Sequence, residues 1–406
     1  MAAKYEELLL EIGCEEMPAS WLPVITDNLV SSLGSRLTQA RIHCEGAITA
    51  FNTPRRFGVS IERMHDRQAD LEETITGPPV SASFDPDGSP RPAAMGFARK
   101  QGVQVEDLSR VQTAKGEYLA YNRRQRGKET TQVLPDVLAE TLRDIAFPKQ
   151  MHWDATLDDG HGEFVFGRPI RWLLFLFAGK VVPFVIGRTE GANIVGVEPV
   201  RSGNVTYGHR FFCRTGEPGL ALYVKSFADY KKTLADGYVL IDRDERRDRI
   251  ASKLKKCAEK VGGNVAPLGE GSALLDEVPD LVEYPAVVTG SFPDEFLSLP
   301  DEVLSTTMIH HQHYFPVIDR NRQLKANFLA VTNTPRDNVV RIARNSERVL
   351  VARLRYARFF WEGDRAHRLD ARLDRLETLL FHKKLGSYRQ KSERVALLAS
   401  KIAGEV

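Results

Sequence analysis

Three histidines, at positions 310, 311 and 313, come nearest in type and spacing to a metal site. If residues 311–315 are extended, His311 and His313 lie on one face of the strand. Zinc needs three or four ligands, however, and no nearby cysteine or acidic residue has a suitable spacing. We therefore expect no metal site and interpret the histidines as packing and hydrogen-bonding groups at a helix-to-strand junction. The alternative is that residues 312–315 stack on an RNA base.

No other pattern indicates a self-sufficient active site. His65-Asp66 is the only His-Asp pair, and a metal-dependent hydrolase of that type needs further ligands from helices. The chain contains no GxSxG, HExxH or Walker motif. The carboxylate pair Glu15-Glu16 is too common a pattern to indicate acid–base catalysis. We predict no catalytic residue and no cofactor in this chain.

Arginine is the residue type with the clearest functional pattern. Between residues 336 and 375 we count eleven arginines and six acidic residues, although the net charge of the whole chain is only +2. Leu350, Leu354, Ala357 and Trp361 recur at helical spacing, which predicts a helix with one buried face. The candidate RNA contacts on the flank of this helix are Arg348, Arg355 and Arg358. A solvated face with local ion pairs explains the pattern equally well.

Two further arginine pairs stand at strand ends. Arg55 and Arg56 follow Pro54, which fixes a turn and is expected to place both arginines at its edge. Arg168 and Arg171 flank Pro169 where an apolar strand begins, so that one of them points from the rim of the sheet. Each pair fits phosphate contact, and each also fits a structural ion pair or a solvated turn.

The elements that must position these residues alternate between helix and strand. Strands are expected near 7–12, 47–51, 57–61, 117–123, 170–177, 181–186 and 314–318, and helices near 18–39, 93–100, 132–145 and 243–261, with a further helix that begins at Pro300. From residue 366 onward the pattern is helical throughout. We predict a multi-domain α+β chain with mixed or antiparallel sheets, packed helices and an all-helical end. The expected regions are a βαββ-like domain over 1–76, a central α+β region of one or two subdomains over 77–335, and an arginine-rich helical region over 336–406.

Length and composition are those of an ordinary globular protein. The chain has 406 residues, 42% of them hydrophobic and 27% charged, so an ample core and two or three domains are expected. The longest apolar run, residues 172–178, is too short to span a bilayer. The four cysteines show no metal-ligand spacing. We expect a cytoplasmic protein with reduced thiols and no membrane association.

Several motifs, in order along most of the chain, carry a family resemblance. The chain resembles the beta subunit of bacterial glycyl-tRNA synthetase, the form of that enzyme built from separate alpha and beta chains. The motifs are Leu-Leu-Leu-Glu-Ile-Gly-Cys-Glu-Glu-Met-Pro at 8–18, Thr-Pro-Arg-Arg-Phe at 53–57, Gly-Pro-Pro at 77–79, Arg-Pro-Ile-Arg-Trp at 168–172, Gly-His-Arg-Phe at 208–211, Leu-Leu-Asp-Glu-Val-Pro-Asp-Leu-Val-Glu-Tyr-Pro at 274–285, the stretch 300–364 and Leu-Gly-Ser-Tyr-Arg-Gln-Lys at 385–391.

The resemblance implies a tRNA-binding subunit of an alpha2beta2 glycine–tRNA ligase. In that family glycine and ATP, with magnesium, are bound by the alpha chain, while the beta chain binds tRNA(Gly). The partners it implies are therefore the alpha subunit and tRNA(Gly). It also favours RNA contact as the role of the arginine motifs. A second hypothesis is an assembly chain that holds the alpha subunits without touching RNA.

The chain departs from the family pattern at a few positions. Asn345 and Ser346 stand where glycine and asparagine are expected, and His152 stands where arginine is expected. Pro279 lies inside a helical pattern and is expected to kink or divide that helix. Beta subunits of this family continue into an HD-type helical domain and an anticodon-binding domain. We expect this chain to be an N-terminal portion that ends where an HD-like domain starts, or an unusually short member.

Overall fold

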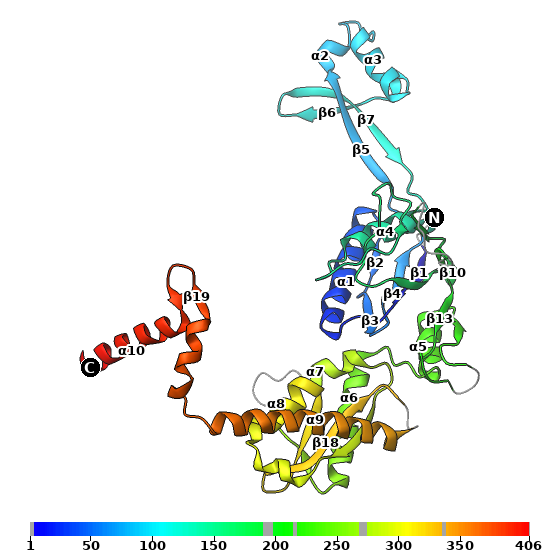
Figure 1. Ribbon diagram of the computed structural model, residues 1–406. Helices are drawn as coiled ribbons and strands as arrows, with labels where there is room; N and C mark the ends of the chain where they lie inside the picture. Colours follow the sequence, from blue (N-terminus) through cyan, green and yellow to red (C-terminus); the bar gives the residue numbers. More distant parts are fainter. Residues whose placement is uncertain (1–3, 190–197, 214–216, 268–273, 335–337, 406) are drawn as a thin grey trace. The chain divides into compact units, whose positions relative to one another are not determined.

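The computed structural model (Figure 1) describes residues 4–189, 198–213, 217–267, 274–334 and 338–405. The chain divides into two units. Unit 1 comprises Met1–Arg246 and Pro279–Tyr284, and unit 2 comprises Arg247–Val278 and Pro285–Val406. The predicted α+β class with several sheets is confirmed.

A nine-stranded sheet forms the centre of unit 1, with the strand order β2-β4-β1-β9-β12-β11-β8. Strand β3 pairs with β4, and β10 pairs with β9. Both neighbours of β1 are antiparallel to it, whereas β12 runs parallel to β9. The strands are β1 (Tyr5–Cys14), β2 (Cys44–Glu45), β3 (Thr49–Thr53), β4 (Arg56–His65), β8 (Ala155–Thr156), β9 (Ile170–Phe177), β10 (Lys180–Val181), β11 (Val185–Arg188) and β12 (Val200–Gly203).

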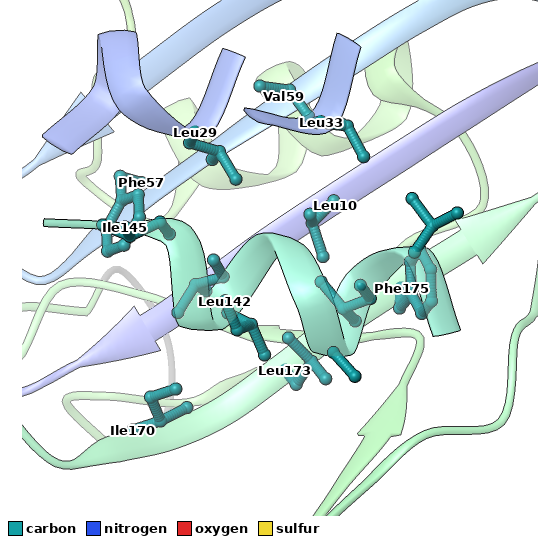
Figure 2. Packing of buried hydrophobic residues seen from close by; sticks show 14 of the residues in the cluster. Leu10, Leu29, Leu33, Phe57, Val59, Leu142, Ile145, Ile170, Leu173 and Phe175 are labelled. Atoms are coloured by element: carbon teal, nitrogen blue, oxygen red, sulfur yellow. The ribbon is translucent and has the colours of Figure 1, made fainter. Parts of the chain in front are cut away.

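Helices cover both faces of this sheet. On one face, α1 (Leu22–Gln39) and α4 (Thr130–Asp144) pack on Leu10, Val59 and Phe175 (Figure 2). On the other face, α5 (Phe227–Asp236) packs on Leu9 and Leu174. Alternate residues of β1 thus enter different cores, which explains its run of seven consecutive buried residues from Leu8 to Cys14.

Unit 1 also carries a separate three-stranded antiparallel sheet, in the order β5-β7-β6. Two short helices connect β5 to β6. A small hairpin of β13 and β14 and the start of α6 complete the unit. These elements are β5 (Leu71–Pro79), α2 (Val80–Ser83), α3 (Pro92–Gln101), β6 (Ser109–Thr113), β7 (Gly116–Gln125), β13 (Val205–Tyr207), β14 (Ala221–Tyr223) and α6 (Arg243–Lys260).

Unit 2 contains a four-stranded antiparallel sheet in the order β15-β17-β18-β16. Helices α8 and α9 pack on it through Leu304, Met308, Leu350 and Leu354. The elements are β15 (Asn264–Val265), α7 (Leu274–Glu277), β16 (Ala286–Ser291), α8 (Asp301–Gln312), β17 (Tyr314–Ile318), β18 (Leu324–Thr332), α9 (Val339–Arg365), the 3-10 helix η5 (Asp370–Thr378), β19 (Leu380–His382), β20 (Gly386–Ser387) and α10 (Tyr388–Glu405).

Several expectations need correction. The expected regions 1–76 and 77–335 do not coincide with the units, because strands on both sides of residue 76 share the nine-stranded sheet. The expected strand 181–186 is two strands, β10 and β11. The end of the chain is not all helical, since β19 and β20 form a hairpin, and β20 begins at Gly386, whose φ of 81° favours glycine.

The expected division of the helix at Pro279 is confirmed. Helix α7 ends at Glu277, and the chain continues as the short 3-10 helix η3 (Val278–Leu281). Proline has no backbone N–H to donate within an α-helix, and its ring clashes with the preceding turn. The chain also passes from unit 2 to unit 1 at this point.

Candidate nucleic-acid interface

The seven arginines predicted from the sequence lie in two different units. Arg55, Arg56, Arg168 and Arg171 belong to unit 1, and the other three lie on α9 of unit 2. The structure therefore brings them together as two groups.

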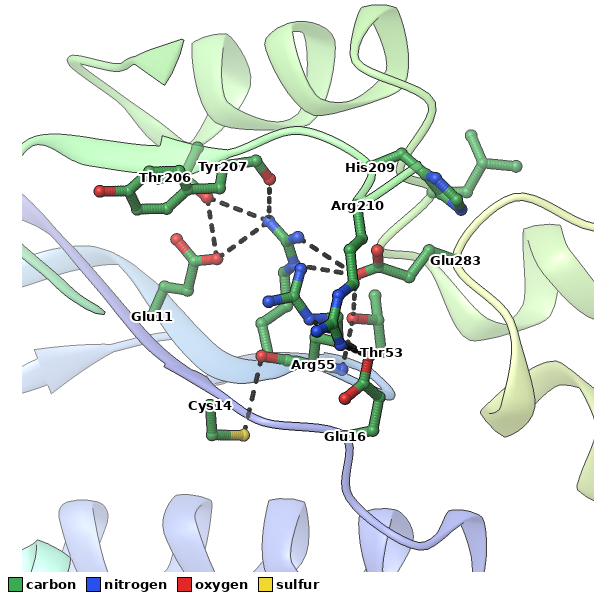
Figure 3. A network of polar contacts seen from close by, with 12 residues as sticks. Glu11, Cys14, Glu16, Thr53, Arg55, Thr206, Tyr207, His209, Arg210 and Glu283 are labelled. Carbon is green, nitrogen blue, oxygen red and sulfur yellow. Dashed lines mark hydrogen bonds and ion pairs between the residues drawn. The ribbon is translucent and has the colours of Figure 1, made fainter. Parts of the chain in front are cut away.

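Arg56 is not at the surface, which corrects the expectation that both arginines of the 53–57 turn lie at its edge. Its side chain is fully buried at the start of β4. Its guanidinium forms ion pairs with two buried carboxylates, Glu11 and Glu283, both of which are labelled in Figure 3. Nη1 donates to Glu11 Oε1 at 3.2 Å and to the carbonyl oxygen of Tyr207 at 2.7 Å, and Nε donates to Glu283 Oε1 at 3.2 Å.

Hydroxyl groups add to this buried network. Thr206 donates to Glu11 Oε1 at 2.9 Å, and Thr53 donates to Glu283 Oε1 at 2.8 Å. Burial raises the pKa of Glu11, while Arg56 and Thr206 oppose that rise. The network links β1, β3, β4, β13 and the 279–284 segment, so Arg56 holds unit 1 together and is removed from the RNA-contact candidates.

Arg55 lies on the opposite side of the turn and is partly accessible. Its Nε is 3.7 Å from Glu16, and its guanidinium lies over the Trp172 ring, 5.5 Å from the ring centroid. Arg210 also pairs with Glu16. Burial raises the pKa of Glu16, but the bonds and charges of Arg210 and Arg55 outweigh it and the pKa lies below its usual value. The carboxylates of the 8–18 motif therefore partly neutralise this surface.

Arg168 and Arg171 differ as the sequence predicts, with one of them at the rim. Cys14 pairs with Ile170 and Gly13 pairs with Trp172, so Arg171 is the extra residue of a β-bulge in β9. Its side chain is exposed and lies 3.4 Å from Glu15. Arg168 is half-buried and donates to the Met151 sulfur at 3.5 Å. Arg171 is thus the more available of the two for an anionic ligand.

Cys14, in the same motif, provides a direct test of the buried side of this region. Its side chain is fully buried and its thiol donates to the carbonyl oxygen of Arg55 at 3.7 Å. Burial raises the pKa of this thiol well above its usual value. We expect Cys14 to resist iodoacetamide at about pH 8 in the folded chain and to react in urea. Mass spectrometry of the peptides measures both, with the half-buried Cys257 as the internal control; equal labelling of the two would contradict the packing around Cys14.

In unit 2, helix α9 has the buried stripe that its periodicity predicts, but the stripe is shorter. Leu350 and Leu354 are fully buried, Ala357 is half-buried, and Trp361 is 36% exposed. Arg358 pairs with Glu295 at 3.1 Å, and its guanidinium lies over the Phe296 ring. The charge of Arg358 is therefore largely neutralised within unit 2, and Arg358 is the weakest candidate for RNA contact on this helix.

Four other arginines of α9 share one solvent-facing side. Arg341, Arg344, Arg348 and Arg355 are all exposed. Their offsets of three, seven and fourteen residues from Arg341 place them within about 60° of one another on a helix, along about 21 Å of its length. Within the described ranges, no carboxylate lies within ion-pair distance of any of the four. We call these four residues the arginine stripe.

Arg341 and Arg344 are not among the RNA contacts predicted from the sequence, although they share the helical spacing of Arg348 and Arg355. Arg358 is among those predicted contacts, but its partner Glu295 lies 63 residues away in the sequence. Nothing in the local sequence indicates that pairing.

The three histidines lie where helix α8 ends. His310 and His311 are exposed on its last turn, and His313 is the C-cap residue with φ of 53°. His313 Nδ1 is 3.8 Å from Glu277. Among the residues that the structure describes, no group of three or more potential ligands could hold a metal ion.

Taken together, the sheets, helices and exposed guanidinium groups define an arginine-bearing α+β protein. A family model described as glycyl-tRNA synthetase beta subunit matches residues 8–406. The chain belongs to the glycyl-tRNA synthetase beta subunit family.

Individual relatives agree with this assignment. The chain is 40% identical over 401 residues to the glycine–tRNA ligase beta subunit of Trichlorobacter lovleyi, covering 99% of this chain and 55% of the relative. It is 39% identical over 397 residues to that of Syntrophotalea carbinolica, covering 98% and 54%. It is also 39% identical over 398 residues to that of Geobacter sulfurreducens, covering 98% and 54%. The chain thus spans about half the length of these curated relatives.

Proposed function

We propose that this chain forms the tRNA-binding portion of the beta subunit of a glycine–tRNA ligase. The observation that carries the proposal is the arginine stripe of α9, in a chain whose family is that of a tRNA synthetase subunit. Exposed guanidinium groups in a row form a favourable surface for a phosphate backbone. The buried residues Leu350 and Leu354 fix the orientation of the helix, so the stripe is held towards solvent.

The partners of this function follow from the same assignment. The relatives are named as beta subunits, which supports a matching alpha subunit as partner. We assign ATP-dependent glycylation, with its magnesium requirement, to that alpha subunit. We assign the binding of tRNA(Gly) to this chain. Among the described residues no helix is both long enough and apolar enough to cross a membrane. A cytoplasmic location is part of this proposal.

Charge reversal on the stripe tests the proposal. We expect the triple variant Arg344→Glu, Arg348→Glu, Arg355→Glu to bind tRNA(Gly) at least about tenfold more weakly at about 0.1 M salt. The slope of log K against log salt is expected to fall by about three, because each lost phosphate contact removes about one released counterion. Fluorescence anisotropy with labelled tRNA, over about 0.05–0.2 M salt, measures both quantities.

A matched control separates the stripe from total charge. Lys255, Lys256 and Lys260 are exposed on α6 in the same unit, and their reversal to glutamate changes the net charge by the same amount. This control is expected to retain most of the affinity and the slope. Equal losses in both triple variants, or no loss in either, would remove the stripe from the RNA interface.

A second candidate function, an assembly chain for alpha subunits without RNA contact, also has an observation in its favour. Tyr356, Phe359 and Phe360 of α9 are 68%, 70% and 63% exposed, and such apolar surface is typical of protein interfaces. The same titration distinguishes the two functions. Tight tRNA binding with a steep salt dependence by this chain alone would exclude the assembly-only function.

A further inference from the structure

A cavity of about 630 Å³ lies in unit 1 where β9, β11, β12 and β13 meet. Its wall includes three arginines from three different strands or strand ends, two aromatic residues and one acidic residue. These are Arg171, Arg188, Arg201, Trp172, Tyr207 and Glu198. The volume is in the range of small-molecule sites in proteins.

The three arginines reach the wall of the cavity from different positions in the fold. Arg171 is the bulged residue of β9, and β-bulges commonly re-aim a side chain beside a site. Arg201 is exposed on β12, whose parallel pairing with β9 places the two strands side by side. Arg188 ends β11 and is half-buried.

Arg188 is held by neutral groups. Its Nη1 donates to the carbonyl oxygen of Trp153 at 3.0 Å, and its Nη2 donates to the carbonyl oxygen of Glu198 at 3.2 Å. These bonds orient the guanidinium without cancelling its charge. Its group also lies over the Trp153 ring, 5.3 Å from the centroid.

The wall of the cavity carries three arginines and one acidic residue, and the two other nearby carboxylates are not among its lining residues. Glu198 lies on the wall, Glu15 is 3.4 Å from Arg171, and Asp154 acts on Arg188 from a distance. Burial lowers the pKa of Arg188, Asp154 opposes this, and the nearby charge of Arg171 lowers it further. Like charges that face one another in a partly dry site are stabilised by a bound anion.

We propose that this cavity binds a phosphate group, held by Arg171, Arg188 and Arg201. Guanidinium groups bind phosphate oxygens through paired hydrogen bonds, and three of them from separate strands can surround one tetrahedral anion. Two sources share this chemistry: a free nucleotide, and a phosphate of an RNA strand. The site lies in unit 1 and does not depend on the arginine stripe of unit 2.

Calorimetric titration of the 406-residue chain at constant ionic strength tests the site. The probes are inorganic phosphate, ATP and a short RNA that carries a 5′-phosphate. We expect inorganic phosphate to compete with whichever of the other two binds, and Arg201→Glu and Arg171→Glu each to weaken that binding at least about tenfold. Arg201→Lys keeps the positive charge but not the planar guanidinium group, and it is expected to lose less binding affinity than Arg201→Glu.

Arg110→Glu is the control, because Arg110 is exposed on β6 in the separate three-stranded sheet of unit 1. It is expected to bind as the wild type does. Arginine-dependent binding of ATP would identify a free nucleotide as the source, and binding of the RNA alone would identify a strand. Absence of binding by every probe, or an equal loss in Arg110→Glu, would overturn the proposal. Urea unfolding of each variant, followed by tryptophan fluorescence, shows whether a loss of binding reflects a loss of folding.

Discussion

Replacement of Arg56 by methionine is expected to lower the free energy of unfolding of unit 1 by about 3–5 kcal/mol. The side chain is fully buried, and so are Glu11 and Glu283, the two carboxylates it bonds. Methionine fills much of the volume but leaves both buried carboxylates without the Arg56 guanidinium. Breaking a buried ion pair in this way costs far more than losing a surface pair, because the remaining charge has no water around it.

Urea unfolding followed by tryptophan fluorescence measures this effect. Trp21, Trp153 and Trp172 lie in unit 1 and Trp361 lies in unit 2, so a Trp361→Phe background makes the signal report on unit 1. Arg63→Met is the matched control, because Arg63 lies on the same strand but is half-exposed beside Glu45. It is expected to change stability by less than about 1 kcal/mol.

The deficit of Arg56→Met is expected to shrink as the pH falls from about 8 to about 5. Burial raises the pKa of Glu11 in the folded protein, and Arg56 is one of the groups that oppose this rise. Without Arg56 the folded state holds the proton on Glu11 still more strongly than the unfolded state does. A group with a raised folded-state pKa favours folding at low pH, and that contribution is lost as the pH rises.

A deficit that stays constant with pH would show that lost packing, and not an unpaired carboxylate, causes the destabilisation. Glu283→Gln in the Arg56→Met background gives a second measurement of the same cause. It removes the charge of one of the two buried carboxylates that lose Arg56, so it is expected to recover part of the lost stability. No recovery would contradict the role assigned to the ion pairs.

Local sequence patterns predicted the elements that position these residues. The strands 170–177 and 314–318 have the predicted bounds, and helix α6 differs from its predicted range by one residue. These segments have a clear apolar periodicity or flanking turn residues, and such signals act over a few residues. The buried stripe of α9 was predicted for the same reason at Leu350 and Leu354.

Arg56 shows why the site itself was harder to predict. Arg55 lies in the two-residue turn between β3 and β4, whereas Arg56 is the first residue of β4 and is fully buried. Which of them is buried depends on Glu11 and Glu283, which are 45 and 227 residues from Arg56. The pairing of β9 with β1 is equally distant in sequence. No feature of the sequence near residue 56 indicates that these residues are its partners.

The cavity arginines illustrate the same limit. Arg171, Arg188 and Arg201 stand in three sequence segments with no shared motif, and strand pairing alone makes them neighbours. The arginine stripe is the opposite case, because all four residues lie on one helix and their spacing could be read directly. Sites built within one element are therefore more predictable from sequence than sites assembled by a sheet.

Gly13→Ala is expected to lower the free energy of unfolding of unit 1 by about 3 kcal/mol. A Cβ atom on Gly13 would lie 1.9 Å from Cε2 of Trp172 and 2.0 Å from its Cδ2. The indole is a rigid group that is 7% exposed, and Arg56 and Tyr207 lie against it. It therefore cannot move aside without disturbing the buried ion pairs and the wall of the cavity.

Gly34→Ala provides the contrast, since Gly34 lies within α1 and an added Cβ would meet only Ile48, at 3.6 Å. Alanine is the better helix former, so this change is expected to stabilise unit 1 by up to about 1 kcal/mol. In a Trp172→Leu background the cost of Gly13→Ala is expected to fall by about 2 kcal/mol, because the clashing ring is gone. Trp21 and Trp153 still report unfolding there. If Gly13→Ala costs the same with and without the indole, backbone conformation and not the indole contact requires glycine at this position.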